Sequence, residues 1–521
     1  MESLLASPTA VDSFPRVVLE DFLLRRLVEV APLQYDTARL TPGQFILSRS
    51  CLRLVDGKRV LVSLERRDGN LGEEATLHLV RRWRELCVER ESLLAEAAAS
   101  VSDAATVRRW VEENGGVAFI ANGSVLARDG GASDPDSPLG ASCRSVPFVA
   151  PASLQREVPL GGGRSVEGLL IPRGVTVITG GGFHGKSTLL RALAMGSLDK
   201  IPGDGRELCV TTGRSMTIRS EDGRCVGAVD ISPFISGLPP SCGIDVSNFS
   251  TASASGSTSS ASGVMEALEM GCSLFLLDED TSAGNFMIRD SRMRSLIDNE
   301  PITPYIYRVN SLHRQLGVST IVVVGGSGDW FDVQDTTLQL DDYACRDVTR
   351  RVLQISKTFC TGRVEYNGRG LVHQLPWTHE APTPAAQRRF DIAQLAVSGL
   401  GSDAAAVRAS EDGQVLLYGP RLSLDLSKIE QRVPTREAQA AALGVGAAFL
   451  WLSRSSALTA RGTVSVREAM DAYAAAQGVG GEEWDDIVAE LGPRPFVLPL
   501  PTILAASLNR LRGLAFYKNN A

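Results

Sequence analysis

The sequence predicts a mixed α/β protein with a parallel-sheet core at residues 142–360. An α+β region at 1–141 precedes this core and a mainly helical region at 361–521 follows it. Three observations support this. Between 142 and 360, apolar strands alternate with Gly-rich loops and helices. Residues 129–141, rich in Gly, Asp, Ser and Pro, read as a boundary loop. Beyond 361 the composition turns Ala-rich, as in helices. A chain of 521 residues also exceeds what one hydrophobic core usually supports.

Composition narrows the functional classes. The net charge of -7 and pI near 5.5 exclude a diffuse basic surface, so any nucleic-acid site must be a local patch. The nine cysteines include no Cys-x-x-Cys pair, which argues against a zinc site and favours a reducing intracellular compartment. The longest apolar run, 440–452, is too short to cross a bilayer. The first thirty residues resemble neither a signal peptide nor a mitochondrial presequence. We therefore expect a soluble intracellular protein without membrane partners.

In the N-terminal region, alternating patterns predict strands at 45–47, 60–64 and 117–120. A long amphipathic helix is predicted at 75–99, followed by a second helix near 105–113. The predicted apolar face of the helix at 75–99 consists of Leu77, Val80, Trp83, Leu86 and Cys87. In the C-terminal region, helices are predicted at 435–452, 466–476 and 504–514.

A Gly-rich loop of the form G-x-x-x-x-G-K-[ST] follows the strand predicted at 175–179 and precedes a helix at 188–195. In such a phosphate-binding loop (P-loop), backbone N–H groups and the helix N-terminus surround phosphates. Lys186 would reach the β- and γ-phosphates, and Ser187 would offer its hydroxyl to magnesium. A chance match in a Gly-rich turn is the alternative, and the strand–loop–helix context argues against it. The predicted ligands are ATP and Mg²⁺, and the loop residues are Gly180, Gly181, Gly182, Phe183, His184, Gly185, Lys186, Ser187 and Thr188.

An acidic pair ends the apolar strand predicted at 273–277. Asp278 would hold magnesium through its water shell, and Glu279 would orient or deprotonate the attacking water. Acidic residues often cap strands for structural reasons alone. Behind a complete P-loop, however, the pair predicts catalytic roles for Asp278, Glu279 and Lys186.

A Ser-rich segment lies upstream of the acidic pair and contains Ser255, Gly256, Ser257 and Thr258. Its distance from Asp278 is that of the L-S-G-G-Q signature of ABC ATPases, with Ser257 and Thr258 replacing the second Gly and the Gln. A helix at 258–270 would point its N-terminus at a phosphate. A flexible Ser-rich linker is the alternative interpretation, which the spacing opposes.

Residues 278–290 read D-E-D-T-S-A-G-N-F-M-I-R-D. With A-S-G-S-T-S at 254–259 and further matches between about 17 and 515, the chain resembles the predicted ABC-class ATPase family of bacteria and some protists. The resemblance implies that Ser255–Thr258 serve the nucleotide of a partner subunit in a head-to-tail homodimer. In its departures from the family pattern and its many Ser and Cys residues, the chain resembles family members that are attached to mitochondrial RNA editing in kinetoplastid parasites. That resemblance implies a mitochondrial setting, RNA, and other RNA-processing proteins as partners.

Two residues that ABC ATPases commonly use are absent. No glutamine occurs between Gln155 and Gln315, so Asp230 is the acidic candidate for the usual Gln position. No histidine follows the strand predicted at 320–324, where Ser327 and Asp329 stand instead. Because these positions sense the γ-phosphate, we expect slow hydrolysis.

Some residues carry two interpretations. Phe148 is a core residue or a platform for adenine. His184 lines the loop rather than acting as a catalyst. Arg350, Arg351, Lys357 and Arg363 form a solvated charged face or contact RNA.

The sequence leaves three functions open. The first is an ABC ATPase whose dimerisation acts on RNA, and the second is a nucleotide-gated RNA clamp with negligible turnover. The third is the ATPase subunit of a transporter, which the missing glutamine and the large flanking regions oppose.

Overall fold

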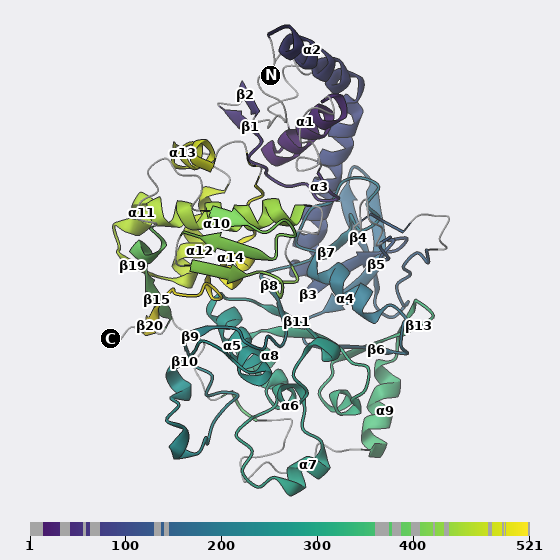
Figure 1. Ribbon diagram of the computed structural model, residues 1–521. Coiled ribbons are helices and arrows are strands. Elements are labelled where there is room, and N and C mark those ends of the chain that lie inside the picture. Colours follow the sequence, from purple (N-terminus) through teal and green to yellow (C-terminus); the bar gives the residue numbers. More distant parts are fainter. Residues whose placement is uncertain are drawn as a thin grey trace.

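The structure is a computed structural model. It describes residues 14–31, 42–55, 59–62, 73–129, 137–139, 145–359, 375–377, 387–396, 407–419, 422–431, 437–477, 482–491, 494 and 496–518. Arg363 and the first residues of the helix predicted at 435–452 lie outside these ranges. Figure 1 shows the N-terminal region at one end, the C-terminal region beside it, and α6 and α7 at the opposite end. None of the helices in the described part of the chain is both long and apolar enough to span a membrane.

A six-stranded sheet forms the centre of the core. Its order is β14-β13-β6-β12-β11-β8, and its strands pair in parallel except for β14, which is antiparallel to β13. The strands are β6 (Val175–Gly180), β8 (Ser215–Ile218), β11 (Leu274–Asp278), β12 (Ser319–Val323), β13 (Thr336–Asp341) and β14 (Ala344–Asp347). Because the β6, β11 and β12 carboxyl ends meet at one edge, the residues that follow these strands lie together.

Both faces of this sheet are covered, which explains its continuous apolar strands. Leu274, Leu276 and Ile321 pack with α4 (Lys186–Ala194) on one face. On the other face, Phe275 and Leu277 pack with α5 (Gly256–Glu269) and α8 (Val309–Leu316). The alternation follows from the two-residue period of a strand.

A second, antiparallel sheet covers the other side of α4. Its order is β4-β5-β3-β7, with β3 (Gly116–Ala121), β4 (Gln155–Gly161), β5 (Arg164–Pro172) and β7 (Cys209–Thr211). The strand predicted at 117–120 is therefore confirmed as β3, but its partners β5 and β7 belong to the core region. The predicted boundary near 141 thus follows a strand of this sheet.

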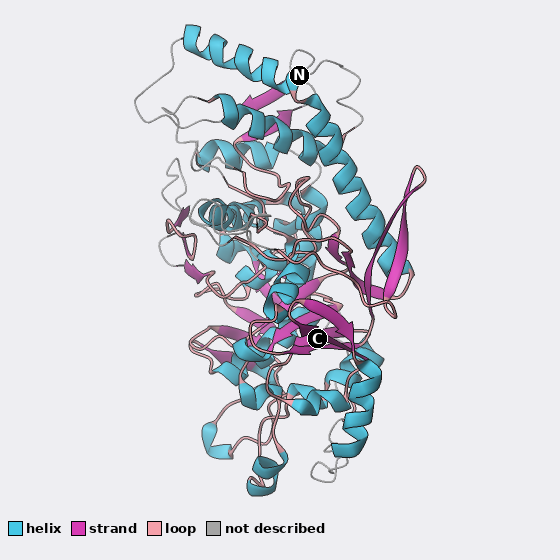
Figure 2. Ribbon diagram, turned by 90° about the vertical axis from the view of Figure 1, so that its right-hand side faces the viewer, coloured by secondary structure: helices cyan, strands magenta, loops and turns pink. Residues whose placement is uncertain are grey.

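The N-terminal region contains α1 (Arg16–Val30), β1 (Leu52–Val55), β2 (Arg59–Val62), α2 (Glu73–Glu89) and α3 (Glu91–Glu113). The helix boundary expected between 99 and 105 was wrong, because the helix breaks at Arg90 and α3 then runs unbroken to Glu113. Trp83 and Cys87 pack against α1, whereas Leu77 and Val80 are exposed. Figure 2 shows α3 extending from this region toward the four-stranded sheet, on which its lower half packs. Residues 45–47 form no named strand; Phe45 makes one bridge with Lys200.

Helices predominate in the described C-terminal region: α10 (Ala438–Arg454), α11 (Ser456–Thr459), α12 (Val466–Ala476), α13 (Glu482–Leu491) and α14 (Pro501–Leu508). Two three-stranded sheets accompany them, which the Ala-rich composition did not predict. The helix predicted at 504–514 ends at Leu508, and beyond it the side chains of Asn509 and Arg510 bond to Arg388 and Glu221. The strands are β15 (Arg388–Asp391), β16 (Val407–Ala409), β17 (Val415–Tyr418), β18 (Leu422–Asp425), β19 (Thr463–Ser465) and β20 (Phe516–Lys518).

Smaller elements complete the core: β9 (Val226–Val229), β10 (Phe249–Thr251), α6 (Gly284–Met287), α7 (Ser291–Leu296) and α9 (Thr349–Phe359). Buried ion pairs tie the C-terminal region to this core. Arg388 binds Glu269 of α5 at 2.6 Å, and Arg510 binds Glu221 just after β8 at 2.5 Å. Burial alone would raise the pKa of Glu221, but the Arg510 guanidinium holds it below its usual value.

Candidate nucleotide-binding site

The Gly-rich loop joins β6 to α4 at the carboxyl edge of the six-stranded sheet. Gly180 has φ 141°, and a Cβ there would lie 2.1 Å from the Leu340 carbonyl oxygen. Gly185, the N-cap of α4, has φ 91°. Side chains are strained or excluded at both positions, so the glycines of the motif are required by the backbone. The loop therefore has the strand–loop–helix geometry that the motif predicts.

Lys186 is the first residue of α4, and its ammonium group turns back over the loop. Nζ donates to the carbonyl oxygens of Gly180 and Gly181 at 2.9 and 2.6 Å. The positive charge is thereby held at the mouth of the loop, beside the N-terminal N–H groups of α4. This is an arrangement for binding an anion such as phosphate.

Ser187 and Asp278 meet across the sheet edge. The Ser187 hydroxyl donates to Asp278 Oδ2 at 3.0 Å, and Asp278 is only 9% exposed. Hydroxyl and carboxylate oxygens are the hard ligands that Mg²⁺ prefers. The two residues lie close enough to share one hydrated cation, so they fit the magnesium that the sequence predicts.

Glu279 is positioned by the loop after β12. Its Oε2 accepts hydrogen bonds from the backbone N–H groups of Gly325 and Gly326 at 2.7 and 2.8 Å. The carboxylate is half-buried beside Asp278 and therefore has one fixed direction. The sequence did not predict this role of Gly325 and Gly326, because it depends on the pairing of β11 with β12. Ser327 follows them as the N-cap of a short 3₁₀ helix at Gly328–Asp332.

The Ser-rich segment forms the start of α5. Ser255 is the exposed N-cap, and its Oγ lies 3.1 Å from Thr258 Oγ1. Ser257 is buried and donates to Asn285 Oδ1 at 2.6 Å. Within the described residues, no recorded hydrogen bond or ion pair joins Ser255–Thr258 to the P-loop. One chain therefore does not bring these two groups together.

Asp230 lies elsewhere. It follows β9, which pairs only with β10 among the described strands, and its Oδ1 accepts from the Ser232 hydroxyl at 2.6 Å. On the side of β11 away from β12, the neighbouring parallel strand is β8, and it leads into Arg219. Arg219 donates to Glu430 at 2.5 Å. The sequence did not predict this neighbour of β11, because parallel pairing between distant strands leaves no local signal.

A cavity of about 200 Å³ opens beside the P-loop. Phe148 lines it but is 4% exposed, so its ring is part of the core wall. Tyr343 is 52% exposed and borders the cavity from the β13–β14 turn. His184, also in the wall, accepts from the Asp342 backbone N–H at 3.3 Å. Further lining residues include Leu126, Val146, Gly185 and Thr188.

Nothing in the sequence predicts the place of Tyr343 beside the P-loop. Asp342 and Tyr343 have φ 48° and 66°, so two consecutive non-glycine residues occupy the left-handed region in a two-residue hairpin turn. Such turns usually carry Asn-Gly or Asp-Gly, so Asp-Tyr gives no sequence signal. A Cβ on Gly185 would lie 3.2 Å from Tyr343 Cδ1, which places the tyrosine ring against the loop.

The predicted basic stretch lies on α9, away from these residues. Arg350, Arg351 and Lys357 are exposed. Leu353 and Phe359 are also exposed, at 45% and 73%. α9 packs on β13 and the 3₁₀ helix Gly328–Asp332 through its other face, where Val352 is buried and Ser356 binds Asp332. Arg363 lies outside the described residues.

Comparisons with known proteins agree with this site. A family model described as the P-loop domain of ABC ATPases matches residues 90–374, more than half of the chain. An uncharacterized protein of Methanocaldococcus jannaschii, MJ1628, is 30% identical over 287 residues, which cover 53% of this chain and 63% of that protein. The match thus spans less than two thirds of the relative's length.

Two solved structures show weaker similarity. One is an inward-facing putative metal-chelate type ABC transporter, with 15% identity, a TM-score of 0.28, and coverage of 47% of this chain and 88% of that one. The other is cbiO1 from Clostridium perfringens, with 16% identity, a TM-score of 0.25, and coverage of 39% and 90%. Scores this low carry no further conclusion. The match to the P-loop family model does, and by it the chain belongs to the ABC ATPases.

Proposed function

We propose that the protein is an ATPase that binds MgATP at the P-loop and couples its nucleotide state to RNA. The observation that carries the ATPase assignment is the juxtaposition of Ser187, Asp278 and Glu279 at one sheet edge. Magnesium, when bound, would neutralise charge on the β- and γ-phosphates. Ser187 and Asp278 would hold the ion, and Lys186 would leave the loop carbonyls to meet the phosphates.

Glu279 would orient the attacking water. Its carboxylate is already fixed by two backbone N–H groups, which reduces the reorganisation needed at the moment of reaction. Ser327 stands where a switch histidine is usual, which supports slow turnover.

The nucleobase would enter the cavity beside the loop, between the Phe148 wall and Tyr343. Its volume of about 200 Å³ is suited to one ring system rather than a whole nucleotide. The phosphates would then extend toward Lys186.

The second half of each site would come from another copy of the chain. Ser255 is exposed at the N-terminus of α5, a 14-residue helix whose dipole favours negative charge. Because it has no phosphate loop of its own beside it, a head-to-tail homodimer would use it to contact the partner's nucleotide.

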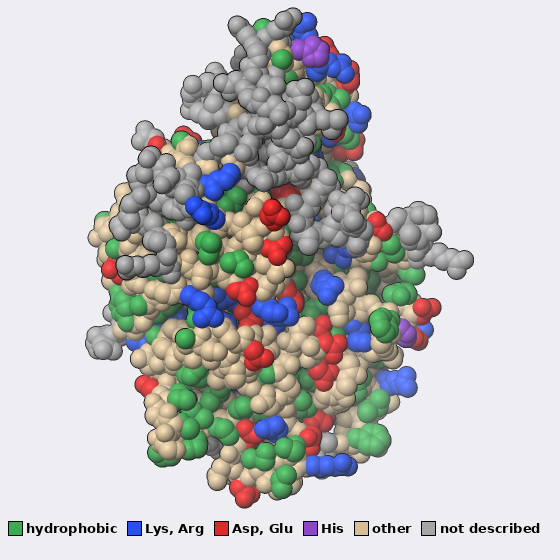
Figure 3. Space-filling view, viewed as in Figure 1, with side chains coloured by type: hydrophobic (Ala, Val, Ile, Leu, Met, Phe, Trp, Pro, Cys, Tyr) green, Lys and Arg blue, Asp and Glu red, His purple; other side chains and the backbone are tan. Residues whose placement is uncertain are grey.

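RNA is the proposed macromolecular partner, and the resemblance to RNA-editing members motivates it together with a mitochondrial setting. On the face shown in Figure 3, Lys and Arg side chains are interspersed with Asp and Glu. A diffuse electrostatic mode is thus disfavoured. α9, with three exposed basic residues and exposed Phe359, combines the charge and stacking surface that single strands prefer.

The rival function is a nucleotide-gated RNA clamp with negligible turnover. Steady-state ATP hydrolysis by the full chain and by Glu279→Gln separates the two. We expect the parent to hydrolyse ATP and the variant to lose roughly 100-fold or more, while both bind MgATP. Glu411→Gln, an exposed residue in the C-terminal region, is the matched control. A parent without turnover, or a Glu279→Gln protein as active as the control, would contradict the ATPase assignment.

A further inference from the structure

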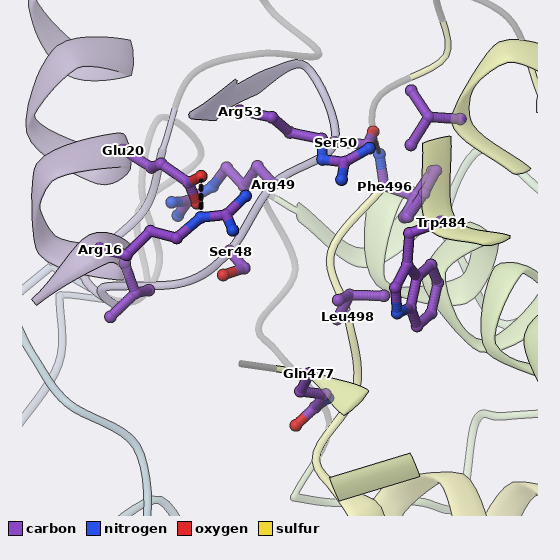
Figure 4. Close-up of a pocket in the computed structure, with 12 residues that line it drawn as sticks. Arg16, Glu20, Ser48, Arg49, Ser50, Arg53, Gln477, Trp484, Phe496 and Leu498 are labelled. Carbon is purple, nitrogen blue, oxygen red and sulfur yellow. Dashed lines mark hydrogen bonds and ion pairs between the residues drawn. The ribbon is translucent and has the colours of Figure 1, made fainter. Parts of the chain in front are cut away.

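A second cavity, of about 270 Å³, lies between the N-terminal and C-terminal regions. Figure 4 shows residues of α1 and the segment 48–53 on one side, and residues of the C-terminal region on the other. Two hydrogen bonds between Ser50 and Phe496 hold the walls together. The Ser50 backbone N–H donates to the Phe496 carbonyl oxygen at 3.0 Å, and the Phe496 backbone N–H donates to Ser50 Oγ at 2.9 Å. The cavity is therefore preformed rather than a gap between loosely placed regions. The residues that line the cavity include Arg16, Glu20, Arg53, Trp484, Val488 and Phe496.

The C-terminal wall is aromatic and rigid. Trp484 is 6% exposed and stacks on Trp451 with ring centroids 5.8 Å apart and planes 11° apart. Tyr473 meets the same ring edge-on at 6.3 Å. Phe496 adds a second buried ring. A fixed aromatic wall favours a flat, apolar-faced ligand over a flexible chain.

The N-terminal wall is polar but electrically balanced. Arg16 pairs with Glu20 at 2.8 Å, and Arg53 pairs with Asp485 at 2.6 Å. Beneath them, buried Arg49 bonds to both Asp21 and Glu437. Each guanidinium already has a carboxylate partner, so the wall offers hydrogen-bond donors and acceptors without excess positive charge. This wall therefore favours a ligand with a neutral polar edge over an anionic ligand.

Trp484 supplies a group that lacks a partner. Its indole Nε1–H is buried and has no hydrogen-bond acceptor among the described residues. Figure 4 shows this nitrogen on the side of the ring toward Gln477. An unpaired buried donor is unfavourable, and a ligand acceptor that reached it would satisfy it.

From these features we propose that this cavity is a second binding site, for a neutral heteroaromatic ring of the nucleobase class. Such a ring has apolar faces for the Trp484 and Phe496 wall and carbonyl or ring-nitrogen acceptors for Trp484 Nε1–H. Its remaining edge donors and acceptors match Arg16, Glu20 and Arg53. The site does not share residues with the P-loop, so it stands independently of ATP binding.

The test uses calorimetric titration of the full chain with uridine and with adenosine. In Val488→Trp an indole would fill the cavity from α13, and we expect at least one nucleoside to bind about tenfold more weakly or not at all. Leu417→Trp adds the same side chain at an exposed position of β17 and should bind like the parent. MgATP is titrated separately into each variant, so failure of the ATP site is distinguished from failure of this one.

Trp484→Phe keeps the aromatic wall and removes only the unpaired donor. Nucleoside affinity should fall about fivefold, even if Val488→Trp proves unstable. Titration with an octamer of uridylate distinguishes the two sources of the ring. If the octamer binds and Val488→Trp weakens that binding, the site takes bases of a strand. If only the nucleosides bind, the site takes free nucleosides. Equal affinities in Val488→Trp and Leu417→Trp, or no binding of any of these probes, would overturn the proposal.

Discussion

At the scale of single residues, the site depends on side chains whose partners come from distant parts of the chain. Asp278 and Glu279 are neighbours in sequence, yet they face different partners. Asp278 meets Ser187 of α4, while Glu279 meets Gly325 and Gly326 after β12. The motif thus contains two carboxylates with separate partners, one beside Ser187 and one held by the loop after β12.

Tyr343 tests the proposed nucleobase position. Tyr343→Ser keeps a residue tolerated in a turn and removes the ring beside Gly185. If the base stacks there, MgATP affinity should fall about 5- to 140-fold, because base–aromatic stacking contributes about 1–3 kcal/mol. Affinity for inorganic tripolyphosphate, which has no base, should stay unchanged. Equal losses for both ligands in calorimetry would show instead that the variant disturbs the P-loop.

At the scale of elements, α5 links the signature segment to the C-terminal region. Glu221 donates its backbone N–H to Ser259 in the first turn of α5, and its carboxylate binds Arg510. Arg224 pairs with Glu266 farther along the same helix. A movement of α5 on nucleotide binding would therefore be transmitted directly to residues 509–512.

Mixing two inactive variants tests the head-to-tail dimer. Lys186→Ala removes the P-loop cation, and Ser255→Glu places a negative charge where a partner's phosphate would lie. Each alone should be inactive, but a heterodimer contains one site without either change. A 1:1 mixture should recover about a quarter of the parental ATPase rate, if subunits exchange freely and sites act independently. A mixture as inactive as its components would count against composite sites.

At the scale of the whole molecule, sequence patterns predicted the features that depend on short segments of the chain. The P-loop, β11 and α5 were correctly placed because a few consecutive residues contain the periodicity and the glycines that indicate them. The position of β8 beside β11, the fixing of Glu279 by Gly325, and the contact of Tyr343 with the loop all depend on long-range pairing. The composition after residue 361 indicated helices but not the short strands between them.

Salt dependence tests the RNA surface of the whole molecule. If Arg350, Arg351, Lys357 and Arg363 each contact a phosphate, replacing all four by alanine should lower the slope of log affinity against log salt by about 3 for a single strand. The matched control replaces four arginines of α2 and α3, namely Arg81, Arg82, Arg84 and Arg109, which are exposed. If filter binding shows the lower slope only in the control, the RNA surface would lie on the N-terminal region instead.

The buried Arg49 has a consequence for synthesis of the chain. Burial alone would lower its pKa, and Glu437 and Asp21 raise it above its usual value. Arg49 and Glu437 are 388 positions apart. At roughly 5–20 residues per second, about 20 to 80 s pass before the ribosome supplies that second carboxylate. During this interval the N-terminal region carries a guanidinium that it cannot yet bury with both partners. The N-terminal region thus completes its folding only after residue 437 has been made, and it is exposed to chaperones and proteases meanwhile.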